Sequence, residues 1–167
     1  MKKVLFLSAL FCAALLAAAP LDLQMPFKKG EKDAVEGWKS TGKLIDVAGG
    51  KAVALDKLQG IEFKKQFTGK AGDKLAFEIN MKKEDGFVSL RVGQWSKEGW
   101  IGENFVLLEA KKEYSVVKGE IILKDAAVPD KAGIMRKVNR FHLKFYAHSN
   151  SKGTEIKDIK IELIPAK

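Results

Sequence analysis

Apolar and polar residues alternate one by one along most of the chain after residue 35. In the clearest run, Leu75, Phe77 and Ile79 alternate with small or polar neighbours. This alternation predicts strands with one buried face, because successive side chains of a strand point to opposite sides. Strands are expected in these ranges: 43–47, 52–58, 61–67, 75–81, 88–92, 104–109, 113–118, 120–124, 141–145 and 156–163.

The spacing of the turns predicts the fold class. Turn signals recur roughly every 8–12 residues, and no stretch past residue 20 shows helical periodicity over three turns. The loop expected at residues 126–139 contains Pro129 and Gly133. We therefore expect an all-β protein, an antiparallel sandwich or barrel of about nine to ten strands. A length of 167 residues fits one such domain.

The first 19 residues are expected to be a signal peptide. Lys2 and Lys3 precede an apolar run that is broken only by Ser8 and ends in alanines. As a helix this run would span roughly 24 Å, which is short of a ~30 Å hydrocarbon core. Removal is therefore favoured over an uncleaved anchor. Ala17 and Ala19 both fit the rule for cleavage, so the position of the cut stays open.

Export changes the composition that the folded protein carries. Removing residues 1–19 takes away two lysines, no acids and the only cysteine, so the net charge falls from +9 to +7. A chain without cysteine suits an oxidising compartment, and we expect a secreted or periplasmic bacterial protein. The positive charge favours acidic partners, although lysines interleaved with acids are also typical of a solvated surface. An exported protein is not expected to bind nucleic acid, and after cleavage we expect no transmembrane span.

The order of several motifs resembles that of the galactose-binding-like jelly rolls, which include many secreted carbohydrate-binding modules. Gly37-Trp38 resembles the end of that family's opening segment, and residues 49–55 resemble its second strand. Residues 67–81 resemble its turn followed by a long strand, and residues 141–163 resemble its last two strands. The resemblance covers roughly residues 26–165. A polar lead-in with Pro20, Pro26 and Gly30 is expected at residues 20–35, followed by a jelly-roll sandwich at residues 36–167. The resemblance also implies carbohydrate binding.

Strand alternation sorts side chains into a core set and a candidate binding set. The core set is Leu75, Phe77, Ile79, Val88, Leu90, Val92, Phe141, Leu143 and Phe145. If their three strands share one sheet, the opposite face carries Glu78, Asn80, Ser89, Arg91, His142, Lys144, Tyr146 and His148. Such a face suits a sugar, because arginine and carboxylate groups bind hydroxyls in a fixed direction and a tyrosine ring can stack. The alternative is an ordinary solvated sheet face.

Three tryptophans are expected to have different roles. Trp95 and Trp100 lie in a Gly-rich polar segment, and loop tryptophans often serve as platforms for recognition, so at least one is expected to be exposed. Trp38 is expected in the core.

His142 and His148 lie six residues apart on one face, roughly 20 Å along a strand, so they cannot share a metal.

The resemblance also bears on calcium, because many relatives carry a structural calcium site with two adjacent acids in the last strand. Here Lys157 replaces one of the two acids, next to Asp158. Asp158 together with Glu31 or Asp33 would supply oxygen ligands for calcium. The alternative is that these are ordinary surface acids.

These observations support three hypotheses. The first is a secreted, monomeric, non-catalytic module that binds a polysaccharide or glycan, neutral or acidic, through Trp95, Trp100, Arg91, Glu78, Asn80, Tyr146 and His142. The alternative is a structural or adhesion module of the cell envelope that binds a protein partner, because fold does not fix function. The third is a small hydrolase, which needs two carboxylates close together in a groove. The sequence carries no G-x-S-x-G, H-E-x-x-H, P-loop or dinucleotide motif.

Overall fold

Every strand of the structure is antiparallel to its neighbours, and the described residues hold no long helix. The structure is a computed structural model that describes residues 19–31, 35–123, 127–129 and 132–167. The strands are β1 (Ala19–Pro20), β2 (Trp38–Ser40), β3 (Lys43–Val47), β4 (Gly50–Leu55), β5 (Gly60–Phe63), β6 (Lys74–Lys82), β7 (Val88–Trp95), β8 (Trp100–Leu107), β9 (Ser115–Ile122), β10 (Ala127–Pro129), β11 (Met135–Lys137), β12 (Arg140–Ala147) and β13 (Thr154–Ile164).

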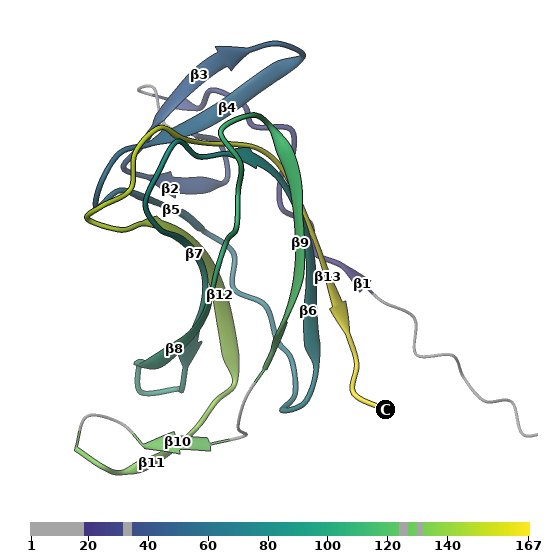
Figure 1. The fold of residues 1–167 in the computed structure, drawn as a ribbon. Helices are drawn as coiled ribbons and strands as arrows, with labels where there is room; N and C mark the ends of the chain where they lie inside the picture. The colour runs from purple at the N-terminus through teal and green to yellow at the C-terminus, as the bar shows by residue number, and fades with distance from the viewer. Residues whose placement is uncertain (1–18, 32–34, 124–126, 130–131) are drawn as a thin grey trace, which may run out of the picture.

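The strands form two stacked sheets (Figure 1). The six-stranded sheet has the order β3-β4-β13-β6-β9, with β1 paired to β13. The five-stranded sheet has the order β2-β5-β12-β7-β8, and β10 and β11 form a separate hairpin. The predicted all-β antiparallel sandwich is therefore confirmed.

The inner faces of the two sheets meet in one apolar core. All nine residues of the predicted core set are buried, among them Ile79 of one sheet and Leu90 and Phe145 of the other. Trp38 is also buried, as expected. Its ring centroid lies 5.0 Å from that of Phe63, and its indole N–H donates to the carbonyl oxygen of Leu23 at 3.1 Å. Burying this ring with its one donor satisfied is strongly stabilising.

The structure differs from the expected strands at a few elements. Residues 113–118 and 120–124 were expected as two strands, but β9 runs continuously through Gly119. A Cβ at residue 119 would lie 2.6 Å from Cζ of Phe77, so this glycine makes room for a core ring and does not mark a turn. The expected loop at 126–139 contains the short hairpin of β10 and β11, and β1 and β2 were not expected.

The segment expected as a lead-in contributes to the core. Leu23, Phe27 and Val35 are buried against the sandwich, and Leu21 donates its N–H to the carbonyl of Ile161 at 2.9 Å. Residues 1–18 lie outside the described part of the chain, so the signal peptide remains a prediction. No helix in the described part is both long and apolar enough to cross a bilayer.

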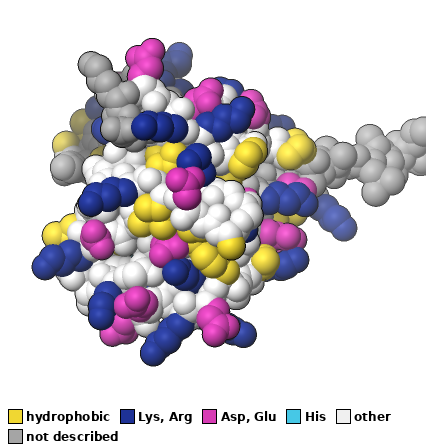
Figure 2. Space-filling model, turned by 90° about the horizontal axis from the view of Figure 1, so that it is seen from above, with side chains coloured by type: hydrophobic (Ala, Val, Ile, Leu, Met, Phe, Trp, Pro, Cys, Tyr) yellow, Lys and Arg dark blue, Asp and Glu magenta, His cyan; other side chains and the backbone are white. Residues whose placement is uncertain are grey.

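Charged side chains of both signs are mixed on the surface. Figure 2 shows lysines and acids interspersed with apolar side chains on the face seen from above. Exposed ion pairs such as Lys51–Asp46, with 2.5 Å between Nζ and Oδ1, contribute little stability because water screens them.

Candidate functional site

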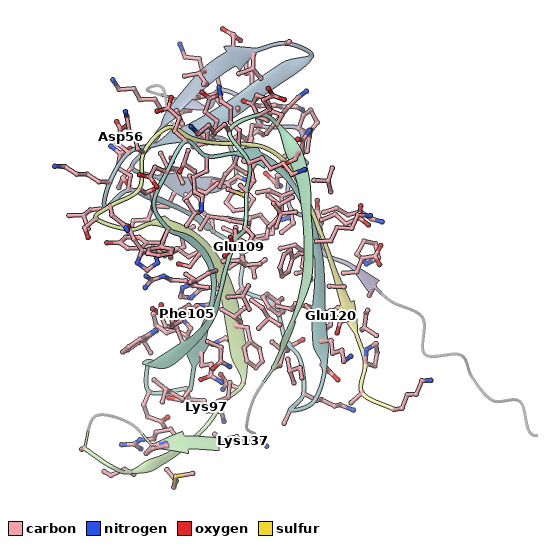
Figure 3. The ribbon with its side chains drawn as sticks, viewed as in Figure 1. Asp56, Lys97, Phe105, Glu109, Glu120 and Lys137 are labelled. Carbon is pink, nitrogen blue, oxygen red and sulfur yellow. The ribbon has the colours of Figure 1, made fainter. Side chains whose placement is uncertain are left out.

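The outer face of the five-stranded sheet brings together most of the predicted binding residues. Figure 1 shows β7 and β12 curved, with this face on the concave side, and Figure 3 shows Phe105 on it and Glu120 on the opposite sheet. The strand register places Arg91 beside Lys144 on one side and Phe105 on the other. Tyr146 lies beside Ser89 in the next row. These side chains share one surface because paired residues of neighbouring strands point the same way.

Arg91 is the centre of a hydrogen-bonded network on this face. Its Nη1 donates to Oε1 of Glu103 at 2.5 Å, and its Nε donates to the hydroxyl of Ser89 at 3.0 Å. The ring of Tyr146 covers the guanidinium, with 4.3 Å from Cζ to the ring centroid. These contacts fix the position of the guanidinium, which preorganises it for directional binding.

His148 also belongs to this hydrogen-bonded network. Its Nε2 lies 3.1 Å from the hydroxyl oxygen of Ser89, and its ring meets Tyr146 edge-on at 5.4 Å. Because Ser89 accepts from Arg91, its own hydroxyl proton is free to point at His148. Burial lowers the pKa of His148, and the neighbouring positive charge of Arg91 lowers it further.

Trp95 and His142 form a second pair on the same face. The indole N–H of Trp95 donates to Nδ1 of His142 at 2.5 Å. The imidazole lies over Gly93, where a Cβ would approach Cε1 of His142 to 2.6 Å. Burial lowers the pKa of His142, more strongly than the acid Glu62 raises it. A neutral imidazole is what this bond requires, because a protonated Nδ1 cannot accept.

Open apolar side chains border this polar network. Trp100 is 46% exposed, Phe105 57% and Leu107 45%. Trp95 and Trp100 were expected in a loop, but they end and begin two strands and face each other across the β7–β8 hairpin. A register shift between Gln94 and Trp95 puts the two rings on the same side. The expectation that at least one of the two tryptophans is exposed is confirmed by Trp100.

A shallow pocket continues the face toward β2. It has a volume of about 210 Å³ and is lined by Lys39, Thr41, Leu58, Gly60, Glu62, Lys144 and Tyr146. Gly60 is one of the lining residues, and a Cβ there would lie 2.6 Å from the carbonyl oxygen of Phe145. The pocket therefore offers two ammonium groups, one carboxylate and one aromatic ring.

Two predicted site residues belong to the other sheet. Glu78 and Asn80 lie on β6 of the six-stranded sheet, whereas the strands of Arg91 and His142, β7 and β12, belong to the five-stranded sheet. The condition that the three strands share one sheet is therefore not met. Alternation assigns a side chain to the inside or the outside, but it does not say which sheet a strand joins. The segment after β6 crosses to the second sheet and does not form a hairpin.

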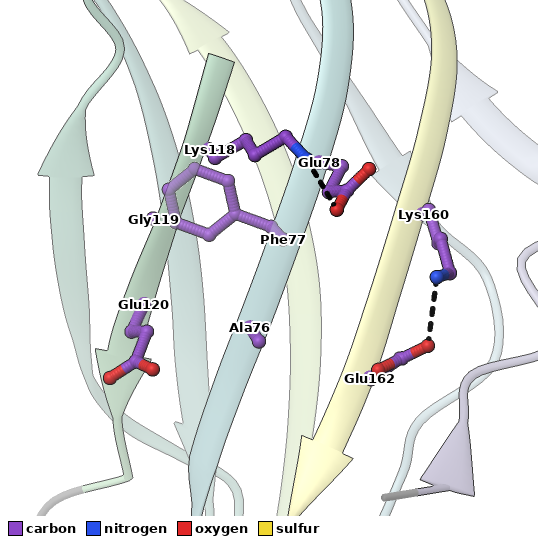
Figure 4. A pocket seen from close by; sticks show the side chains of 8 residues that line it. All are labelled: Ala76, Phe77, Glu78, Lys118, Gly119, Glu120, Lys160 and Glu162. Carbon is purple, nitrogen blue, oxygen red and sulfur yellow. Dashed lines mark hydrogen bonds and ion pairs between the residues drawn. The ribbon is translucent and has the colours of Figure 1, made fainter. Parts of the chain in front are cut away.

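Glu78 and Asn80 are instead part of a charged surface on the six-stranded sheet. Figure 4 shows a pocket above Ala76, where Lys118 bonds Glu78 at 2.8 Å and Lys160 bonds Glu162 at 3.0 Å. Lys118 lowers the pKa of the Glu78 carboxyl by hydrogen bonding and charge. The amide of Asn80 donates to Oδ2 of Asp158 at 3.3 Å. The charged and polar side chains of this surface are therefore paired with one another.

The described residues include only two of the three predicted calcium ligands, Asp158 and Glu31. No group of three or more His, Cys, Asp or Glu side chains suited to a metal occurs there. Asp158 lies in β13, and Glu31 lies in the segment between β1 and β2. Asp33 falls outside the described residues, so calcium binding remains a prediction.

Glu103 and Phe105 are two members of the face that the sequence did not suggest. Both lie on β8, where Phe105 is the register partner of Arg91 and Glu103 forms an ion pair with it. The alternation of Glu103, Phe105 and Leu107 after a short hairpin was the available signal. The register shift in that hairpin hides which of them meets Arg91.

Solved structures with this architecture share the whole sandwich. A xylan-binding module, CBM15, superposes with a TM-score of 0.53 at 16% identity, covering 90% of this chain and 99% of that one. A family 11 carbohydrate-binding module from Clostridium thermocellum, solved with a β-1,3-1,4-mixed-linked tetrasaccharide, gives 0.50 at 16% identity, covering 89% and 96%. The fold of this chain is a β-sandwich jelly roll like that of these modules.

The jelly roll also occurs within larger proteins. The enzymatically active domain of tailspike protein 4 from bacteriophage CBA120 matches with a TM-score of 0.50 at 10% identity. That match covers 79% of this chain, but the chain spans only 20% of the tailspike chain. No family model and no curated protein sequence matches. At these identities the likeness establishes the fold alone.

Proposed function

We propose that this protein is exported and binds a polysaccharide, without catalysis, through the outer face of the five-stranded sheet. The observation that carries the proposal is the Tyr146 ring over the fixed guanidinium of Arg91, with Phe105 and Trp100 open beside it. Sugar rings have apolar faces that stack on aromatic side chains, and hydroxyls that need directional donors and acceptors. Modules of the same fold are described as binding xylan and a β-1,3-1,4-mixed-linked tetrasaccharide, which supports this ligand class.

The charge of the shallow pocket favours an acidic group on the ligand. Lys39 and Lys144 flank Glu62 in adjacent strands, so the pocket carries a net positive charge. Lys144 also lies over the Tyr146 ring, with 5.2 Å from Nζ to its centroid. A uronate carboxylate stacked near Tyr146 would bind both ammonium groups.

The placement of the acids supports binding without hydrolysis. On this face Glu62 and Glu103 are separated by three strand spacings, on β5 and β8. At about 4.8 Å per spacing their backbones lie roughly 14 Å apart. Glycosidases hold their two carboxyl groups about 5–9.5 Å apart. Glu103 is also held in an ion pair with Arg91.

The test is a binding panel of neutral and acidic polysaccharides, run with calcium and with chelator on the protein purified from cells that express the full chain. We expect binding to at least one polymer. Tyr146→Ala and Trp100→Ala should each weaken it about tenfold or more, because a stacked aromatic contributes that much at a binding hot spot. Lys160→Ala, on the other sheet, is the matched control and should bind like the wild type.

Three results would contradict the proposal. Failure to bind any polysaccharide of the panel would exclude carbohydrate as the ligand. It would favour the alternative of an envelope module that binds protein. Equal loss of binding in Tyr146→Ala and Lys160→Ala would place the ligand elsewhere on the molecule. Release of reducing sugar from a bound polymer would contradict the absence of catalysis.

A further inference from the structure

Strand β9 ends the six-stranded sheet and presents an open edge. It pairs with β6 on one side, and no other described strand pairs with it. Figure 1 shows β9 at the margin of the sheet. Two of its outward side chains are apolar and exposed, Val116 at 55% and Ile122 at 51%. A long edge strand with apolar residues is a template for pairing with another strand.

The sequence of β9 is complementary to itself about Gly119. If two copies of β9 pair antiparallel with Gly119 at the centre, Lys118 of each copy faces Glu120 of the other. In the same register Val116 faces Ile122 of the second copy on the outer side. Val117 faces Ile121 of the second copy on the inner side. Directly opposed residues of this kind stabilise antiparallel pairs, whereas opposed like charges destabilise them.

The charges of the neighbouring strands agree with this register. Lys118 lies in a row with Glu78 and Lys160, which has two positive side chains and one negative. Glu120 lies in the next row, beside Ala76 and Glu162, which has two negative side chains. In the dimer, the two-fold axis therefore places the mainly positive row of one copy beside the mainly negative row of the other. Lys118 is paired with Glu78 and Glu120 with Lys74 within the chain, at 2.8 and 2.9 Å, but their side chains are 64% and 50% exposed, so both present an accessible charge at the seam.

We propose that two copies of this chain associate through their β9 edges, antiparallel about Gly119, and extend the six-stranded sheets into one continuous sheet. The contact is isologous, because each pairing occurs twice about the two-fold axis. It hides both open edges and covers Val116 and Ile122. This proposal replaces the monomer expected from the sequence, and it does not depend on the ligand of the other face.

The test uses charge reversal at the seam, with the mass in solution measured by sedimentation as a function of concentration. We expect the wild type to dimerise. Lys118→Glu sets two carboxylates against each other in both of the central charge pairs, and Glu120→Lys sets two ammonium groups against each other there. Each variant should weaken the dimer about tenfold or more. Lys160→Glu makes the same charge change on the interior strand β13 and should leave the dimer unchanged.

Recombining the variants separates pairing from misfolding. The double variant Lys118→Glu, Glu120→Lys restores opposite charges in every pair and should recover the wild-type dimer. An equimolar mixture of the two single variants should form a heterodimer, because one edge is then acidic and the other basic. A monomeric wild type would overturn the proposal. So would a dimer that both single reversals leave intact, or one that the double variant fails to restore.

Discussion

The imidazole of His142 has a defined protonation state, because its Nδ1 accepts the indole N–H of Trp95. The proton of the neutral ring is therefore on Nε2. His148 is placed in a similar way, with its Nε2 next to the Ser89 hydroxyl. Burial lowers the pKa of both histidines, so the folded protein binds protons at these sites less readily than the unfolded chain. Proton uptake then opposes folding.

Because the pKa of both histidines is lowered in the folded protein, the free energy of unfolding is predicted to depend on pH. In the window from about pH 6.5, the ordinary pKa of histidine, down to the lowered pKa values, the unfolded chain holds more protons than the folded one. The free energy of unfolding should therefore fall as the pH falls through this window and then level off. Urea unfolding at a series of pH values measures it.

A double variant provides the control for this prediction. His142→Asn and His148→Gln keep an acceptor near Nδ1 and Nε2, respectively, but do not titrate. Together they should flatten the profile between about pH 5 and 7, where carboxylates are already ionised. A wild-type profile that rises as the pH falls through the window would contradict the assigned direction of both pKa shifts.

Strand β7 carries a glycine, Gly93, at the point where the ring of His142 needs space. Gly93 faces His142 across the β7–β12 pair, and a Cβ there would lie 2.6 Å from Cε1 of the ring. We predict that Gly93→Ala displaces His142, breaks its bond to Trp95 and lowers the free energy of unfolding by about 1–3 kcal/mol. Chemical unfolding and the tryptophan emission spectrum of the folded protein measure both effects.

Gly102 on the neighbouring strand is the matched control. A Cβ at this position would meet nothing closer than Oε1 of Gln94 at 3.9 Å. Gly102→Ala should therefore leave the emission unchanged and be neutral or stabilising by about 0.5–1 kcal/mol, because alanine loses less entropy on folding. If Gly93→Ala behaves in the same way, the ring of His142 does not need that space.

Single strands could be predicted well from the sequence, and their irregularities could not. Alternation located β6, β7 and β12 and placed their core residues correctly, because burial of one face acts on every second residue. The register shift at Trp95 has no such pattern, and it decides that Phe105 lies beside Arg91. Gly119 resembled a strand break because the ring that needs its missing side chain, Phe77, lies 42 residues earlier in the chain.

At the scale of the molecule, the sequence predicted the sandwich but not the allocation of strands to its two sheets. Arg91, His142 and Tyr146 share a face because β7 and β12 are neighbours, whereas Glu78 left the predicted site because β6 joins the other sheet. Long-range pairing depends on which crossovers the loops allow, and local alternation carries no information about them. Arg91, His142 and Tyr146 were thus predicted to share a face, whereas Phe105 and the acids Glu62 and Glu103 were not predicted on it.

The proposed dimer and the proposed binding face are connected by geometry. A two-fold axis perpendicular to a sheet leaves the direction of its normal unchanged, and stacked sheets of a sandwich are nearly parallel. Both copies would therefore present the outer face of the five-stranded sheet to the same side. Two faces that reach one polymer surface bind it by avidity, which raises the apparent affinity well beyond that of one face.

This arrangement makes a prediction that separates the two proposals. Lys118→Glu should bind insoluble polysaccharide at least about tenfold more weakly than the wild type, because it loses the second face, but bind a short soluble oligosaccharide of the same sugar equally well. The double variant Lys118→Glu, Glu120→Lys should recover both affinities. Loss of oligosaccharide binding in Lys118→Glu would contradict the separation of seam and face. Equal retention of wild type and Lys118→Glu on the insoluble polymer would show that the two faces do not act together.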